Sequence, residues 1–262
     1  MYKIHLSGGK TGMTPIERSY IYDKVFQLLV DCNITTLPVQ LEKILDFLDV
    51  GLIPLSRIIR GTGCGKEEIF KLWGNRDGHL MTCAVAEGYL LKIAYNDLDF
   101  SQGRTRFTIS EEIAHILLGH YKDDMYRINA PVPWYDEIYQ QHEKQARLAA
   151  GLILCPPPVF YQIPQYLTVQ AISGLCSVTP KCSKTSLNVL FQYQLEIQGR
   201  NSYTRLNNQF LRFVSGKRCL VCRREFIRFD TADRICDHCH KEDIPLFLRC
   251  ADHMSESASV KT

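Results

Sequence analysis

The segment from Arg104 to His120 constrains the fold of this chain more than any other. It reads Arg-Thr-Arg-Phe-Thr-Ile-Ser-Glu-Glu-Ile-Ala-His-Ile-Leu-Leu-Gly-His, and its isoleucine and leucine side chains recur at helical spacing. Thr108 is followed three residues later by Glu111, which is the pattern of a capping box. The segment therefore predicts one amphipathic helix that starts near Thr108.

The polar side chains of this helix have the spacing of a metal site. Glu111 and His115 are four residues apart, so they share one helix face, and Glu112 lies beside them. In the helix motif H-E-x-x-H, two ligands at i and i+4 hold a metal ion, and the Glu between them polarises a metal-bound water. Here the motif reads E-E-x-x-H. In the alternative interpretation Glu111 only closes the capping box, and Glu112 and His115 are polar residues of a solvated face.

A second helix, predicted from Trp134 to Leu154, supplies a candidate third ligand. Glu143 follows His115 by 28 residues, and a downstream Glu on a separate helix completes many sites of this type. His120 is five residues beyond His115, so a continuing helix would point it about 140° away. We therefore expect His120 to be a helix-end residue outside the site.

With these residues in view, the chain resembles the ImmA/IrrE family of metallopeptidases from about Leu37 to Tyr193. The family pattern is an Arg-Phe-Thr lead-in, then H-E-x-x-H, then a helix with Glu-x-x-Ala and Ala-Ala that ends in a proline. The matching residues here are Arg106-Phe107-Thr108, Glu112, His115, Glu143, Ala146, Ala149-Ala150 and Pro156. The chain departs from the family at Glu111, which stands in place of a His ligand, and at Arg147, which stands in place of Asn or Asp.

The resemblance implies an α+β fold: a zincin-like, mainly helical domain over residues 36–193 with a small mixed β-sheet. It also implies a zinc-type metallo-endopeptidase in which Glu112 is the catalytic base and Glu111, His115 and Glu143 bind the metal. The implied substrate is a helix-turn-helix transcriptional repressor of a mobile element or prophage. Glu111 makes the site more anionic than usual and favours harder divalent ions over zinc. The alternative is a catalytically inactive relative that binds a repressor or DNA.

The rest of the chain divides around this domain. Residues 1–35 form an N-terminal helical extension, whose helix starts at the capping box of Thr14 and Glu17. His79–Val85 and Tyr89–Tyr95 are rich in β-branched, aromatic and aliphatic residues and predict two strands joined by a short turn. Residues 194–212 are polar and are interpreted as a linker.

Residues 167–193 predict two short helices joined by a turn, a pattern also seen in DNA-binding proteins. The pair has few basic residues, with Lys181 in the turn and Lys184 in the second helix. Because phosphate contacts need lysine and arginine, this content disfavours DNA binding by the pair. The family resemblance implies instead that the pair is part of the peptidase domain.

Residues 213–250 predict a four-cysteine zinc ribbon. Cys219 and Cys222 form one C-x-x-C knuckle, and Cys236 and Cys239 form a second one, separated from the first by 13 residues. Zinc would supply folding free energy that so small a segment cannot obtain by burial. A rubredoxin-like iron site is the main alternative, and His238 or His240 are alternative ligands. Basic and aromatic residues make nucleic acid a second, less favoured partner of the ribbon.

The cysteine content and the N-terminal sequence predict that the protein is located in a reducing cytoplasm. The chain has 11 cysteines, an odd number, and its N-terminus has no pattern of a secretory signal. No apolar run reaches the length of a membrane span, so no membrane partner is expected. Residues 251–262 are rich in serine and poor in apolar residues, which predicts a disordered tail.

Overall fold

The computed structural model describes residues 12–85, 88–122, 135–162, 168–214, 217–218, 222 and 225–226. The chain divides into two compact units, Met1–Gln209 and Phe210–Thr262. The first unit is α+β, as predicted, because most of its described residues are helical and a small mixed sheet accompanies them. No helix among the described residues is long and apolar enough to cross a membrane.

The sheet has three strands in the order β1-β3-β2. Strands β2 (Gly78–Val85) and β3 (Gly88–Tyr95) pair antiparallel, which confirms the predicted hairpin. Strand β1 (Val50–Pro54) pairs parallel with the other edge of β3, with Val50 opposite Leu91. Strand β1 was not predicted from the sequence, because its five residues include a glycine and end in a proline, residues that are rare inside strands.

In the chain, helices α1 and α2 precede strand β1, and helices α3 and α4 follow it. Helix α1 (Pro15–Asp31) begins at the predicted capping box, in which Glu17 N donates to Thr14 Oγ1 and Thr14 N donates to the Glu17 carboxylate. The other three helices, α2 (Leu41–Phe47), α3 (Leu55–Thr62) and α4 (Lys66–Trp73), are short.

Helix α5 (Gln102–Leu118) carries the E-E-x-x-H motif, and it starts earlier than predicted. Ser101 is its N-cap and accepts from Arg104 N, whereas Thr108 is a buried residue inside the helix. The predicted capping box of Thr108 and Glu111 is therefore wrong. The first turn of α5 packs closely against another segment, since a Cβ on Gly103 would lie 2.9 Å from Thr179 N.

Helix α5 ends sharply at Gly119, which adopts a left-handed conformation with φ of 80°. Such a residue reverses the chain direction at a helix end, and glycine adopts it without strain. The following residues form a short 3-10 turn, η1 (His120–Lys122). Because the helix does not continue to His120, the expectation that this side chain points away from His115 is wrong.

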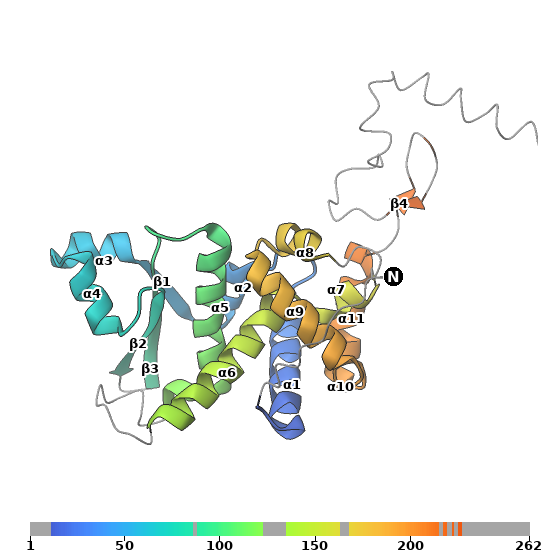
Figure 1. The fold of residues 1–262 in the computed structure, drawn as a ribbon, viewed down its shortest axis with the longest axis horizontal. Coiled ribbons are helices and arrows are strands. Elements are labelled where there is room, and N and C mark those ends of the chain that lie inside the picture. The colour runs from blue at the N-terminus through green and yellow to red at the C-terminus, as the bar shows by residue number, and fades with distance from the viewer. Residues whose placement is uncertain are drawn as a thin grey trace, which may run out of the picture. The chain divides into compact units, whose positions relative to one another are not determined.

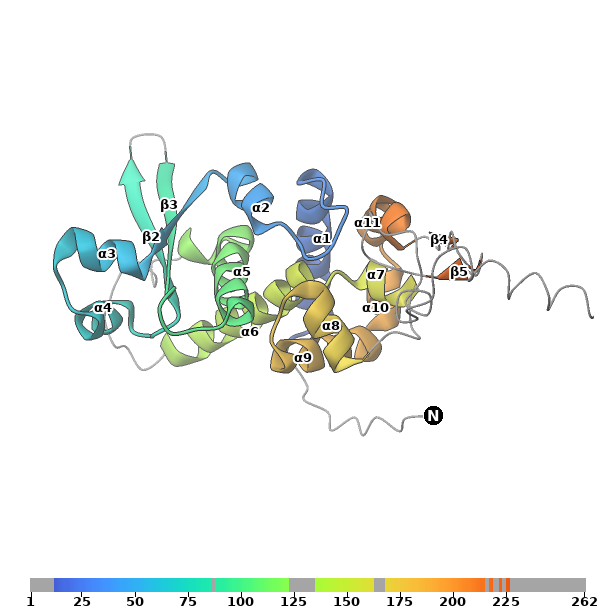
Figure 2. The ribbon, with the colours of Figure 1, turned by 90° about the horizontal axis from the view of Figure 1, so that it is seen from above.

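Helix α6 (Tyr135–Leu154) matches the second predicted helix and packs along α5. Figures 1 and 2 show α5 between the sheet and helix α1, with α6 crossing beside it. Helices α7 (Pro157–Gln162), α8 (Val169–Cys176) and α9 (Pro180–Gln192) follow. The last two confirm the predicted helical pair, and α9 packs against α6.

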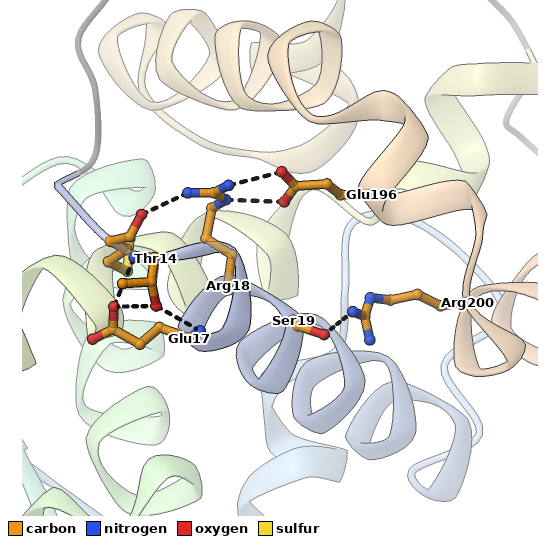
Figure 3. Close-up of polar contacts among 7 residues, drawn as sticks. Thr14, Glu17, Arg18, Ser19, Glu196 and Arg200 are labelled. Carbon is orange, nitrogen blue, oxygen red and sulfur yellow. Dashed lines mark hydrogen bonds and ion pairs between the residues drawn. The ribbon is translucent and has the colours of Figure 1, made fainter.

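The predicted linker over residues 194–212 is wrong, because this stretch is helical. It forms α10 (Gln194–Gln198) and most of α11 (Asn201–Val214). Ile197 and Leu206 are fully buried. Figure 3 shows two arginine contacts that join this stretch to α1: Arg18 binds Glu196, and Arg200 donates to Ser19. The polar residues that suggested a linker lie on the exposed sides of helices whose other sides are apolar.

Little of the predicted ribbon lies within the described residues. Strands β4 (Lys217–Arg218) and β5 (Glu225–Phe226) pair antiparallel, and Cys222 lies in the turn between them. Cys219, Cys236 and Cys239 lie outside the described residues, and so does the predicted tail over 251–262.

Candidate metal centre

Helices α5 and α6 bring together two of the predicted metal ligands. His115, on α5, is 5% exposed, and its Nε2 lies 3.3 Å from Oε1 of Glu143 on α6. Both helices are regular here, so the contact depends on how α5 packs against α6. The predicted convergence of His115 and Glu143 is present in the structure.

Arg147, one turn after Glu143, binds two of the predicted site residues. Its Nη2 donates to Glu143 Oε2 at 2.8 Å, and its Nε lies 3.3 Å from Glu111 Oε1. Glu111 therefore faces α6 as predicted, but it pairs with a guanidinium. Its position inside α5 also excludes the alternative that it caps the helix start.

The two adjacent carboxyl groups of α5 have raised pKa values. Burial raises the pKa of Glu112 to about 7, with a further rise from Glu111 and Glu143 and an opposing effect from His115. Burial also raises the pKa of Glu111 to about 7, although Arg147 acts in the opposite direction. These shifts place both groups near neutrality, where a carboxyl group exchanges protons readily.

Glu143 has the opposite shift. Burial acts to raise its pKa, but its hydrogen bond to His115 and the charges of His115 and Arg147 outweigh burial, so the net pKa is lowered. Glu143 is therefore the carboxylate that stays ionised, as a metal ligand must.

His120, which was not expected in the site, contacts His115 directly. The Nδ1 atoms of the two rings lie 2.9 Å apart, and His120 Nε2 lies 3.0 Å from Gln145 Oε1 on α6. The ring of His142 stacks on His120 with centroids 4.1 Å apart. Burial lowers the pKa of His120 to about 3, so this ring is neutral. The glycine after the apolar run of α5 was the signal that would have predicted this reversal.

No protein-family model matches the chain, and no curated protein matches it. The function must therefore be argued from the geometry and the residues themselves.

The described residues contain no group of three or more His, Cys, Asp or Glu side chains arranged to hold a metal ion. His115 and Glu143 form a pair, and Glu111 would have to leave Arg147 to join them. His115 and Glu143 are therefore placed to bind one metal ion, whereas Glu111 is not in position as a third ligand while it pairs with Arg147. Of the four ribbon cysteines, only Cys222 lies in the described part of the chain.

An apolar cavity of about 190 Å³ adjoins this site between α6 and α9. Arg147 lines it together with Leu148, Leu152, Val189 and Leu190. Arg147 thus touches both the carboxylates and an apolar space large enough for one apolar side chain.

Proposed function

We propose that this chain is a metal-dependent endopeptidase of the zincin type, with a divalent ion held by His115 and Glu143. The observation that carries the proposal is the 3.3 Å distance between His115 Nε2 and Glu143 Oε1. Donors held about 2.0–2.1 Å from one tetrahedral ion lie roughly 3.3–3.4 Å from each other. Without an ion, the same two side chains form a long hydrogen bond, which contributes to the lowered pKa of Glu143.

The other residues have roles that follow from their surroundings. Glu112, whose pKa burial raises to about 7, is suited to take a proton from water and return it to the leaving amine. Glu111 is the third ligand when its carboxylate leaves Arg147. A bound divalent ion would polarise the scissile carbonyl and make water more acidic. The adjoining apolar cavity offers space for an apolar side chain of a peptide.

The ImmA/IrrE resemblance extends the proposal to a substrate class, a helix-turn-helix repressor, but by analogy only. The same resemblance leads us to propose a zincin-like architecture. For the C-terminal module we propose a structural zinc ion on Cys219, Cys222, Cys236 and Cys239, which rests on their spacing alone.

The test of the peptidase is the variant Glu112→Gln, which keeps the size of the side chain and removes its basicity. The full chain, loaded with Zn²⁺ or Mn²⁺, is incubated with candidate repressors, and cleavage is followed by mass spectrometry. We expect cleavage by the natural chain and a loss of at least about 100-fold in the variant. Equal cleavage by both would show that Glu112 is not the base.

One observation favours a second function, a binding protein without catalysis. Arg147 places its positive charge beside Glu111 and Glu143. In a metal site, the metal ion would supply this charge. A chain of this kind would bind a repressor or DNA without cutting it. Metal counting separates the two functions: two ions per chain support the peptidase, and one ion, lost in Cys219→Ser, supports the binding protein.

A further inference from the structure

The apolar cavity between α6 and α9 has a polar rim and an apolar floor. On α6 it is lined by residues at spacings of three and four, which share one helix face: Lys144, Leu148, Gly151 and Cys155. Lys144 is exposed, whereas Leu148 and Cys155 are buried. The lining on α9 changes in the same way, from exposed Thr185 to buried Leu190. A cavity that is apolar inside and has a few polar groups is typical of a site for a small molecule.

Gly151 keeps part of this cavity open. A glycine inside a helix makes the helix less stable than an alanine would, so its presence needs a reason. Gly151 has no left-handed backbone conformation, and an added Cβ would meet only Ser186 Oγ, at 3.6 Å. Neither the backbone nor the packing against α9 therefore requires glycine. Because a side chain here would take up cavity volume, an occupant of the cavity explains the glycine.

The volume of the cavity limits the size of its occupant. It measures about 190 Å³. An apolar protein cavity of about 150 Å³ takes up benzene, so this one suits a chain of roughly six to eight carbon atoms. Walls that face an empty space also lose dispersion contacts, which an apolar chain would restore.

The charge at the rim favours an anion. Two cationic side chains line the cavity, Lys144 and Arg147. Arg147 is already paired with Glu111 and Glu143. Lys144 has no hydrogen bond or ion pair within the part of the chain that the structure describes. A carboxylate at the end of an apolar chain would pair with Lys144 while the chain lies against Leu148.

We propose that this cavity binds a medium-chain monocarboxylate of about eight carbon atoms, with its chain between α6 and α9 and its carboxylate at Lys144. The inference needs neither a metal ion nor cleavage, so it does not rest on the proposed function. In the proposed endopeptidase, the same ligand would compete with an apolar side chain of the substrate.

The test is calorimetric titration of the full chain with octanoate, with hexanoate and decanoate as ligands of other lengths. We expect one octanoate per chain, and hexanoate to bind roughly tenfold more weakly, since it has two methylene groups fewer. Decanoate should bind no more tightly than octanoate, because its longer chain exceeds the cavity. An affinity that keeps rising to decanoate would indicate unspecific apolar association and would overturn the proposal.

Uncharged ligands test the other possible occupants. We expect 1-octanol and N-acetyl-leucinamide, which carries the side chain of a peptide without a charge, to bind more weakly than octanoate. The absence of octanoate binding would overturn the proposal. Tighter binding of N-acetyl-leucinamide would also overturn it, because the cavity would then be a site for a peptide side chain.

The role of the charge is tested by Lys144→Gln. This variant should bind octanoate about threefold to fivefold more weakly and 1-octanol equally well, as expected for the loss of one exposed ion pair. The control is Lys71→Gln on α4, which has the same change in net charge and does not line the cavity. Equal octanoate affinity in the natural chain and both variants would contradict the placement of the carboxylate at Lys144.

The place of the chain is tested at Gly151. Gly151→Ala removes the volume of about one methylene group and should shift the preferred ligand from eight carbon atoms to about seven. Gly151→Leu should fill more of the cavity and weaken octanoate binding at least tenfold, with circular dichroism to confirm that the variant folds. If the leucine variant does not fold, the alanine variant still decides, because its side chain meets no close neighbour. An unchanged chain-length preference in Gly151→Ala would show that octanoate binds elsewhere and would overturn the proposal.

Discussion

Arg147 Nη2 donates to Glu143 Oε2 at 2.8 Å, one helical turn away on α6. The other oxygen of Glu143 faces His115, so the Glu143 carboxylate contacts both the Arg147 guanidinium and the candidate metal position. The guanidinium orients Glu143, but its charge also repels a divalent ion close by. Arg147 is therefore the residue that most directly opposes metal binding in this site.

Replacing Arg147 by Asn should strengthen binding of Mn²⁺ by about tenfold, which corresponds to ~1.4 kcal/mol. The variant removes the nearby positive charge and frees Glu111 to act as a ligand. Calorimetric titration of the full chain measures the change. The control is Arg57→Asn on α3, which has the same change in net charge and should leave the affinity unchanged. Weaker binding by Arg147→Asn would show that orientation of Glu143 outweighs repulsion.

Replacing Glu196 by Ala should lower the free energy of unfolding by about 2 kcal/mol, because it leaves a buried charge without its partner. Arg18 is 7% exposed, and it binds both oxygens of Glu196, at 3.0 and 2.7 Å (Figure 3). Urea unfolding is the measurement. Glu67→Ala is the control, since its pair with Arg76 is exposed and 3.7 Å long and should contribute less than about 0.5 kcal/mol. Equal losses in the two variants would contradict the prediction.

Replacing Gly151 by Ala should raise the free energy of unfolding by about 0.5–1 kcal/mol. Gly151 lies inside α6, and an added Cβ would meet only Ser186 Oγ, at 3.6 Å, beside the apolar cavity. Gly103→Ala is the matched comparison, because its Cβ would lie 2.9 Å from backbone atoms of Val178 and Thr179. That variant should lose at least about 1 kcal/mol. Thermal unfolding of both variants tests the pair, and stabilisation by Gly103→Ala would refute the packing of α5 described above.

Glu17 should make the protein less stable in acid. The backbone hydrogen bond from Thr14 lowers the pKa of Glu17 below its ordinary value of 4.5. A lowered folded-state pKa stabilises the fold above the unfolded pKa, and this stabilisation is lost as the pH falls through the folded pKa. The free energy of unfolding, measured from neutral pH to below pH 4.5, should therefore fall less steeply in Glu17→Gln. An unchanged slope would show that the folded and unfolded pKa values are equal.

Local sequence patterns predicted much of the first unit. The capping box of Thr14 and Glu17, the hairpin and the α8–α9 pair are confirmed, because each depends on residues close together in the chain. Helical periodicity also placed Glu111 and His115 on the face of α5 that meets α6.

The tertiary structure decided the remaining features. Ser101 rather than Thr108 starts α5. Residues 201–214 form a helix whose apolar residues Leu206, Phe210 and Phe213 do recur at helical spacing, but the many polar residues between them favoured a linker, and only the burial of that face decides for a helix. The contacts of His115 with His120, and of Glu111 with Arg147, also depend on packing. The sequence by itself determined which side chains share one face of a helix, since that follows from their spacing along the chain. Only the packing of α5 against α6 decided which of them meet, because ion pairs and hydrogen bonds between distant residues depend on distances that spacing does not set.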